Sequence, residues 1–133
     1  MIDAQKTNVL LVDDDKFLLD MYSMKFTGAG YTVEACLSAK QALEILRGGF
    51  VPAVILFDIT MPEMDGFAFL KALSDGKLAA SALKIALTNQ SGDAEKAKAS
   101  EFGAPVYIIK ASMIPSEVVN TVGEELAKKA KNG

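Results

Sequence analysis

The chain has 133 residues, of which half are hydrophobic and 23% are charged. This length and composition suit one folded domain with a real core and exclude a disordered or fibrous protein. The net charge of −3 and an isoelectric point near 4.9 disfavour direct binding to nucleic acid or to an anionic membrane. Histidine is absent and cysteine occurs once, which excludes His-based triads, structural zinc sites and intrachain disulfides.

No segment of the sequence is typical of a membrane span or a secretory signal. The longest unbroken apolar run is Ala53–Phe57, whereas a membrane span needs roughly 20 residues. Acidic residues from Asp13 onward interrupt the N-terminal region before a signal peptide develops. We therefore expect a cytoplasmic protein without a membrane partner, in which Cys36 stays reduced and packs as a small buried hydrophobe.

Five short apolar segments recur along the chain, and each is followed by a segment with helical spacing. Several are apolar on both faces, which is typical of strands that helices cover on both sides of a parallel sheet. The predicted strands are Val9–Val12, Tyr31–Ala35, Ala53–Phe57, Leu83–Leu87 and Val106–Ile109.

The helical segments are recognised by apolar stripes and by residues that start or stop helices. Ser38 and Gln41 predict a capping box at the start of the second helix. The stripes expected to face the core in the first three helices are Leu18, Met21, Tyr22 and Phe26; Leu43 and Leu46; and Phe67, Leu70 and Leu73.

The last two helices differ in how much apolar surface they offer. The segment Asp93–Phe102 is rich in alanine, with Ala94 and Ala97 as the expected inward residues, so we predict the most loosely held helix. Pro115 starts the final helix, which ends in the solvated run Lys128–Lys131.

Five strands alternating with five helices predict an α/β fold. We expect a doubly wound, flavodoxin-like (βα)5 arrangement: a five-stranded parallel sheet in the order 2-1-3-4-5 with helices on both faces. A single domain should span residues 1–133, with its core at about 8–127 and short polar tails. In such sheets ligands bind beyond the carboxyl ends of the strands.

Chemically active side chains stand where the predicted strands end: Asp13 and Asp14, Asp58, Thr88 and Lys110. Carboxylates about 4 Å apart repel by about 4 kcal/mol at a protein surface, so the three acids need a cation. Mg²⁺ suits oxygen ligands in a site that handles phosphate, and together with the lysine it neutralises the acids. Any single aspartate is explained more simply as a helix cap or turn residue, but the whole constellation is not.

At these positions the chain resembles the receiver domain of two-component response regulators. The matching segments, in order, are VLLVDDD, VILFDITMPEMDG, IALT and YIIK. Thr88 follows Asp58 by 30 residues and Lys110 follows Thr88 by 22, and the resemblance runs from about Val9 to Leu126.

The resemblance implies that Asp58 accepts a phosphoryl group from a phosphohistidine of a sensor histidine kinase or a phosphotransfer protein. Asp13, Asp14 and Asp58 would bind Mg²⁺ together with the backbone carbonyl of Thr60. The ammonium of Lys110 would contact the phosphoryl oxygens.

The resemblance also implies how the signal leaves the site. Thr88 would move toward the phosphoryl group and Tyr107 would follow by changing rotamer, which alters a protein-interaction face. That face would meet a downstream target protein or a phosphorelay acceptor, or would form a dimer on phosphorylation. The chain would then be a switch that assists its own phosphorylation and dephosphorylation, and not an enzyme.

Some positions depart from the pattern of the family. Ala111 follows Lys110 where most receivers have a proline joined by a cis peptide. A cis bond before a residue other than proline costs about 2.5–4 kcal/mol, so we predict a trans Lys110–Ala111 bond. Asn89 stands where receivers usually have a small residue and can narrow the approach to the phosphoryl group. Thr60 and Gln90 occupy positions that vary across the family.

Two functions of other classes stay open. A Mg²⁺-dependent phosphohydrolase that forms an aspartyl phosphate is one, because Asp13-Asp14-Asp15 contains the Asp-x-Asp of haloacid-dehalogenase-like enzymes. The chain lacks the hydroxyl or β-branched residue that these enzymes have just after that pair. It also lacks a cap domain that would select a substrate. A flavin-binding electron carrier is the other, but its phosphate loop should be rich in Ser, Thr and Gly where this chain has three acids.

Overall fold

The computed structural model describes residues 7–132. The five strands form one parallel sheet in the order β2-β1-β3-β4-β5, which confirms the predicted fold class and strand order. No helix in this range has the length and apolar composition needed to cross a bilayer. The elements, in chain order, are β1 (Asn8–Val12), α1 (Lys16–Gly28), β2 (Thr32–Cys36), α2 (Ala39–Arg47), β3 (Val54–Phe57), α3 (Gly66–Asp75), β4 (Leu83–Thr88), α4 (Asp93–Glu101), β5 (Val106–Ile109), the 3-10 helix η2 (Lys110–Ser112) and α5 (Pro115–Asn132).

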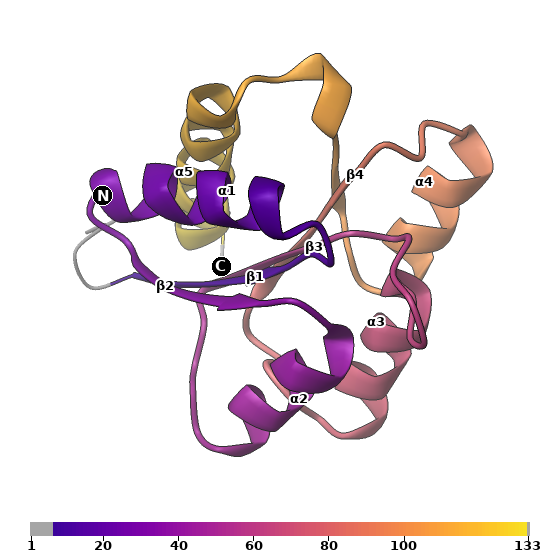
Figure 1. The fold of residues 1–133 in the computed structure, drawn as a ribbon. Helices are drawn as coiled ribbons and strands as arrows, with labels where there is room; N and C mark the ends of the chain where they lie inside the picture. The colour runs from indigo at the N-terminus through magenta and orange to yellow at the C-terminus, as the bar shows by residue number, and fades with distance from the viewer. Residues whose placement is uncertain (1–6, 133) are drawn as a thin grey trace.

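Two helical layers enclose the sheet (Figure 1). Helices α1 and α5 cover one face, where they pack on Val9 and Leu11 of β1. Helices α2 and α3, together with Ala99 of α4, pack on the other face against Leu10 and Val12. Successive residues of a strand point to opposite faces, so a strand buried on both sides must be apolar throughout. This explains the unbroken apolar runs of β1 and β3.

The strand boundaries differ from the prediction by one residue at several ends. Strand β2 begins at Thr32 instead of Tyr31 and includes Cys36, which pairs with Val12. The N–H of Tyr31 donates to the carbonyl of Phe26 at 3.1 Å, so it closes the end of α1 and does not join the sheet ladder. Strand β4 extends one residue further than predicted, to Thr88.

Side chains cap three helices at their N-termini. The Ser38 hydroxyl accepts a hydrogen bond from the N–H of Gln41 at 3.1 Å, as the capping box requires. The Gln41 side chain in turn accepts from the N–H of Leu37, one residue earlier than in a standard box. Asp15 and Asp65 cap α1 and α3, which confirms for Asp15 the simpler explanation of a single aspartate.

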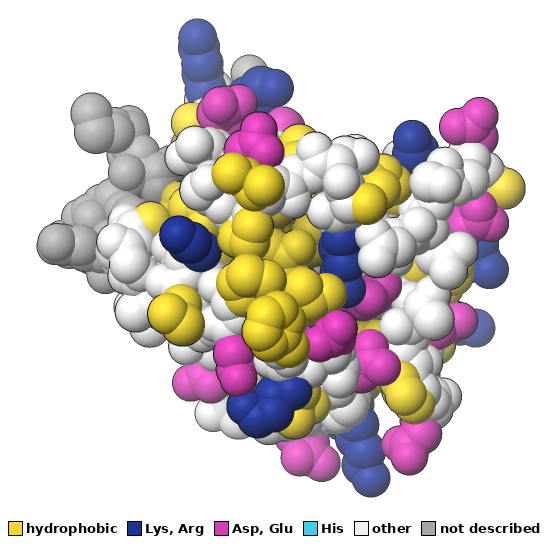
Figure 2. All heavy atoms as spheres, turned by 45° about the horizontal axis from the view of Figure 1, so that its top comes forward, with side chains coloured by type: hydrophobic (Ala, Val, Ile, Leu, Met, Phe, Trp, Pro, Cys, Tyr) yellow, Lys and Arg dark blue, Asp and Glu magenta, His cyan; other side chains and the backbone are white. Residues whose placement is uncertain are grey.

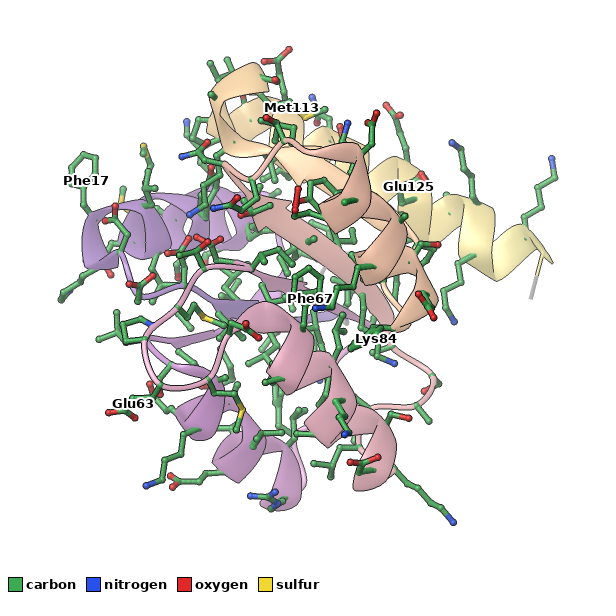
Figure 3. The ribbon with its side chains drawn as sticks, turned by 90° about the vertical axis from the view of Figure 1, so that its right-hand side faces the viewer. Phe17, Glu63, Phe67, Lys84, Met113 and Glu125 are labelled. Atoms are coloured by element: carbon green, nitrogen blue, oxygen red, sulfur yellow. The ribbon has the colours of Figure 1, made fainter. Side chains whose placement is uncertain are left out.

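Helix α4 is held by few buried side chains, as expected, but the predicted inward residues are wrong. Ala94 and Ala97 are exposed, and Ala99 is the buried residue of the helix. Just beyond the helix, Phe102 stacks edge-on against Phe67 of α3, with ring centroids 6.0 Å apart. Figure 3 shows Phe67 on α3, on the side that faces α4. The contact between Phe67 and Phe102 therefore helps to hold the end of α4 against α3, since the helix has no buried apolar stripe of its own.

The first helix also turns slightly from its predicted orientation. Tyr22 and Phe26 are buried as expected, but the third buried residue is Leu19. Leu18 and Met21 are only half-buried. The helix therefore presents part of its apolar surface to solvent, close to the carboxyl end of β1.

Candidate functional site

A hollow of about 390 Å³ opens at the carboxyl ends of the strands. Every predicted site residue except Tyr107 lines it, and Tyr107 joins the site through a hydrogen bond described below. The lining residues are Asp13, Asp14, Asp15, Leu18, Asp58, Thr60, Thr88, Asn89, Gln90 and Lys110.

The strand register explains why residues so far apart in the sequence converge. Val12 pairs with Phe57, and each is the last residue of its strand. The N–H of Asp58 donates to the carbonyl of Val12 at 3.1 Å, and the N–H of Asp13 donates to the carbonyl of Cys36 at 3.0 Å. Both aspartates therefore continue the ladder one step past the strands, so their positions depend on the rigid centre of the sheet.

A buried ion triad forms the centre of the site. The ammonium of Lys110 lies 2.6 Å from Oδ2 of Asp13 and 2.7 Å from Oδ2 of Asp58. The three side chains are only 7%, 6% and 11% exposed. The other oxygen of Asp13 accepts from the N–H of Asp15 at 2.9 Å, and that of Asp58 accepts from the N–H of Thr60 at 3.1 Å. Both carboxylates are therefore fixed in orientation.

The surroundings of these groups shift the pKa values of Lys110 and Asp13 upward, which favours the charged form of the lysine and disfavours the charged form of the aspartate. Burial would lower the pKa of Lys110, but hydrogen bonds to Asp13 and Asp58 and their negative charges outweigh it, so that pKa is raised. The ammonium is thus a permanent positive charge in the site. Burial raises the pKa of Asp13, although its hydrogen bonds to Lys110 and Asp15 act in the opposite direction.

The acidic cluster fits a hard divalent cation. Asp13, Asp14 and Asp58 each offer a carboxylate oxygen, and these atoms lie within 4.8 Å of one another. At that separation two like charges repel by about 3–4 kcal/mol at the effective dielectric of a protein surface. Lys110 compensates one of the three charges, so the cluster keeps a charge that Mg²⁺ would balance. Oxygen ligands with one exposed member, Asp14, suit an ion that retains part of its water shell.

Gln90 links the predicted switch residues at the mouth of the site. Its N–H donates to the Thr88 hydroxyl at 3.3 Å, and its side-chain amide donates to the Thr60 hydroxyl at 3.0 Å. The Tyr107 hydroxyl donates to the carbonyl of Gln90 at 2.6 Å. Burial raises the pKa of Tyr107, with help from Glu95 and Asp58, so the hydroxyl keeps its proton. The sequence identifies Gln90 only as a position that varies across the family. Its place two residues after Thr88, the predicted switch residue, indicates that it lies near the site.

The turn after β5 confirms the prediction for the peptide bond that follows Lys110. The described residues contain no cis peptide, so the Lys110–Ala111 bond is trans. The chain continues into η2, and the N–H of Ala111 donates to the side-chain oxygen of Asn89 at 3.1 Å. The lysine still reaches Asp58, as expected of a flexible four-carbon stem.

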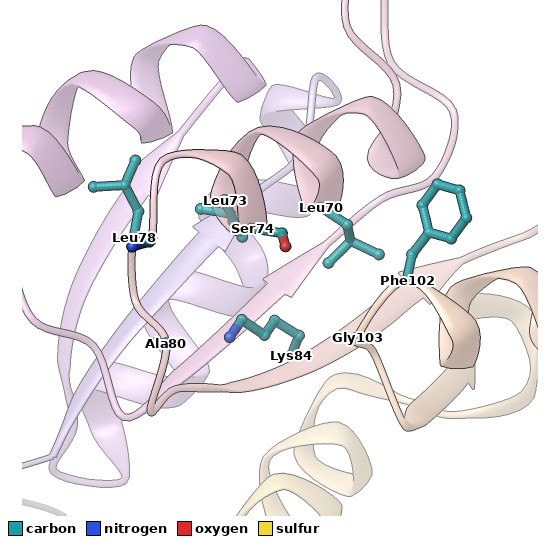
Figure 4. Close-up of a pocket in the computed structure, with 9 residues that line it drawn as sticks. Leu70, Leu73, Ser74, Leu78, Ala80, Lys84, Phe102 and Gly103 are labelled. Atoms are coloured by element: carbon teal, nitrogen blue, oxygen red, sulfur yellow. The ribbon is translucent and has the colours of Figure 1, made fainter.

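A second hollow, of about 400 Å³, lies between the end of α3 and the end of α4 (Figure 4). Leucine side chains form much of its wall, and the ammonium of Lys84 donates to the carbonyl of Ala79 at 2.7 Å. Its lining contains no carboxylate. The chemistry that the sequence predicts for acidic residues therefore belongs to the hollow at the strand ends.

Comparisons with known proteins agree with this geometry. A family model described as the response regulator receiver domain matches residues 9–122. The response regulator SaeR of Staphylococcus epidermidis is 31% identical over 126 residues, which are 95% of this chain and 53% of that protein. SaeR of Staphylococcus aureus is 29% identical, over 94% of this chain and 53% of that protein. The chain thus spans about half the length of these curated relatives.

Solved structures match almost from end to end. A CheY-like receiver domain protein from Methanospirillum hungatei JF-1 has a TM-score of 0.85 and 28% identity, and the match covers 96% of this chain and 98% of that one. The chemotaxis protein CheY4 of Vibrio cholerae has a TM-score of 0.81 and 28% identity, over 89% and 97% of the two chains. The range matched by the family model contains the whole ion triad and the acidic cluster. This chain therefore belongs to the response regulator receiver domain family.

Proposed function

We propose that this chain is a phosphorylation-activated switch in which Asp58 accepts a phosphoryl group. One observation supports this above all: Asp58 is a buried carboxylate whose oxygens are held by Lys110 at 2.7 Å and by the N–H of Thr60 at 3.1 Å. It lies in an open hollow beside Asp13 and Asp14. The phosphodonor would be a phosphohistidine of a sensor histidine kinase or of a phosphotransfer protein.

The proposed transfer asks little covalent chemistry of the protein. A bond forms between a carboxylate oxygen of Asp58 and phosphorus, the bond from phosphorus to the imidazole nitrogen breaks, and the imidazole keeps the electron pair. Catalysis of such a step rests on position and charge neutralisation. Asp13, Asp14, Asp58 and the carbonyl of Thr60 would hold Mg²⁺, which when bound supplies positive charge for the phosphoryl oxygens. Lys110 adds a second positive charge.

The hydrogen bonds at the mouth offer a route for the signal. If the Thr88 hydroxyl turns to a phosphoryl oxygen, it gives up the bond from the N–H of Gln90. The backbone carbonyl of Gln90 also accepts the hydrogen bond of Tyr107, so a shift of the Gln90 backbone would carry the Tyr107 side chain with it. Helix α4 begins just beyond and buries only Ala99, so it can shift at low cost. We expect the face of α4, β5 and α5 to change and to meet a target protein, a phosphorelay acceptor or a second copy.

Hydrophobic side chains beside the hollow support a protein as the donor. Phe17 and Ile114 are exposed over most of their surface. Phe17 lies in the first turn of α1, just after the acidic residues, and Ile114 follows the turn after Lys110. Figure 2 shows hydrophobic side chains gathered next to acidic and basic ones on this side of the molecule, and Figure 3 shows Phe17 pointing outward.

The proposed phosphodonor also indicates a compartment. Histidine kinases take their phosphoryl group from ATP, so we propose that the chain acts in the cytoplasm.

The test is phosphorylation with Mg²⁺ and acetyl phosphate, followed by intact-mass spectrometry. We expect one acid-stable, base-labile phosphoryl group per chain, and no incorporation when Mg²⁺ is chelated before the donor is added. The phosphohydrolase alternative predicts sustained turnover of small phosphomonoesters, which the switch does not perform. Such turnover, or incorporation that does not depend on Mg²⁺, would contradict the proposed function.

A further inference from the structure

A side chain continues the pairing of β4 and β5 beyond the ends of the two strands. Thr88 and Ile109 form the last pair of the parallel register. One residue further on, the backbone of β5 turns into η2 and leaves the ladder. There the side-chain oxygen of Asn89 accepts a hydrogen bond from the N–H of Ala111 at 3.1 Å. Asn89 therefore connects the end of β4 to the turn that carries Lys110.

The side chains of the turn are held by the ion pairs of Lys110 and by packing of Met113 on the core, whereas its backbone has few hydrogen bonds. The backbone bond that closes the turn, from the N–H of Met113 to the carbonyl of Lys110, is long at 3.4 Å. No side chain caps its N-terminal end. Lys110 therefore lies between two fixed points, Ile109 in the sheet and the N–H of Ala111 on Asn89.

We propose that Asn89 is a positioning residue for Lys110, acting through the N–H of Ala111. Holding that N–H sets the direction in which the lysine stem leaves the backbone, and so places its ammonium between Asp13 and Asp58. The kinetic part of this inference rests on the proposed function, but the hydrogen bond itself does not.

The two residues are chemically interdependent. The bond needs an acceptor oxygen on residue 89 and a backbone donor on residue 111. A proline at 111 would have no N–H, so an acceptor at 89 would then have nothing to bind. The two departures from the receiver pattern noted in the sequence are thus the two halves of one contact.

Asn89 also lies between two residues of the mouth network. Its neighbours Thr88 and Gln90 are joined by a hydrogen bond, and Gln90 is bonded to Tyr107. The same short segment therefore holds the lysine turn on one side and the switch residues on the other. A displacement of Thr88 toward the phosphoryl group would therefore also move Asn89 and change its hydrogen bond to the N–H of Ala111.

The first experiment measures the contact directly in the full chain by nuclear magnetic resonance. In Asn89→Ala, we expect exchange of the Ala111 amide proton and of the Lys110 ammonium protons to become about two- to tenfold faster, as for the loss of one ordinary hydrogen bond. Ser91→Ala, an exposed change in the same segment, serves as the matched control and should leave both rates unchanged. Unchanged exchange in Asn89→Ala would overturn the inference.

The second experiment is a double-mutant cycle on phosphorylation by acetyl phosphate. We expect Asn89→Ala to lower the rate at saturating donor about two- to tenfold. Mg²⁺ affinity should stay equal or rise, because a displaced Lys110 ammonium competes less for Asp13 and Asp58, whereas a collapsed site would lower that affinity. The effect of Asn89→Ala should persist with Ala111→Gly, which keeps the N–H, and disappear with Ala111→Pro, which removes it.

The outcomes separate this inference from the proposed function. A wild-type chain that takes up no phosphoryl group contradicts the proposed function, and the exchange rates then decide alone whether Asn89 holds the lysine turn. A phosphorylated wild type with an equally fast Asn89→Ala variant, or an equal loss in the Ala111→Pro background, overturns the positioning role and leaves the proposed function standing.

Discussion

Gly66, the first residue of α3, packs directly against the backbone that carries the proposed phosphoacceptor. A Cβ atom placed on it would lie 2.7 Å from the carbonyl oxygen of Asp58 and 2.8 Å from the Cα of Ile59. Real Cβ contacts essentially never fall below 3.0 Å, and backbone atoms cannot swing aside as a flexible side chain can. The N–H of Gly66 also donates to the carbonyl of Ile59 at 2.8 Å. Gly66→Ala must therefore displace either α3 or the segment that holds Asp58.

The cost of this change follows from close packing. Forcing an extra methyl group into a packed interior destabilises a protein by about 1–3 kcal/mol. The better helix propensity of alanine returns at most about 1 kcal/mol, and less at the first position of a helix. Gly28→Ala is the matched control, because a Cβ there meets nothing within 4 Å and the residue also lies in a helix. We expect that variant to be neutral or more stable by up to about 1 kcal/mol.

Urea unfolding followed by circular dichroism measures both variants. Urea m-values for small proteins are about 1–3 kcal/mol/M; with a value near 2, a loss of about 1–3 kcal/mol lowers the midpoint of Gly66→Ala by roughly 0.5–1.5 M. Phosphorylation of Asp58 should slow in the same variant, because its backbone carbonyl is one of the displaced atoms. A midpoint equal to that of the wild type, or an equal fall in Gly28→Ala, would refute the packing explanation.

Three further predictions follow from single side chains. Burial raises the pKa of Cys36 to about 12 from 9.0. At pH 8 the folded thiol should therefore react with iodoacetamide at least about 100-fold more slowly than the thiol unfolded in urea, and rapid alkylation of the native protein would contradict this. The free energy of unfolding should also fall as the pH rises from 9.0 toward 12, because only the unfolded thiol then loses its proton. Asp14→Asn should weaken Mg²⁺ binding at least about tenfold in a titration without changing the urea midpoint, since Asp14 is exposed; equal affinity would refute the assigned ligand. Tyr107→Phe removes the 2.6 Å bond to Gln90 and should speed amide exchange at the start of α4 about two- to tenfold, whereas unchanged exchange would disconnect Tyr107 from that helix.

The sheet and the acidic cluster could be predicted from the sequence because they depend on strong, local signals. Strands β1 and β3 are apolar on both faces, and an aspartate where such a run stops has no place in the core. Parallel strands bring their carboxyl ends to one edge, so Asp13 and Asp58 had to be neighbours. Lys110 follows β5, which lies two strands from β3 and three from β1, so its reach to both acids depends on its long side chain.

The inward residue of α4 and the contact between Asn89 and Ala111 could not be predicted from sequence patterns. Helix α4 carries no stripe of large apolar residues, so nothing in its sequence distinguished Ala99 from Ala94 and Ala97 as the inward residue. The bond between Asn89 and Ala111 joins residues 22 positions apart and depends on the path of the turn after β5. Such contacts are set by tertiary geometry and not by periodicity.

Localising the phosphoryl group tests the central claim most directly. The chain is incubated with Mg²⁺ and acetyl phosphate or a histidine kinase, digested under acidic conditions, and mapped by tandem mass spectrometry, with Asp58→Ala as the control. Because Asp58 is the carboxylate that the triad and the acidic cluster surround, the group should lie on the peptide containing Asp58 and be absent from the variant. A phosphoryl group on any other residue of the wild type, or unchanged incorporation into Asp58→Ala, would contradict the account.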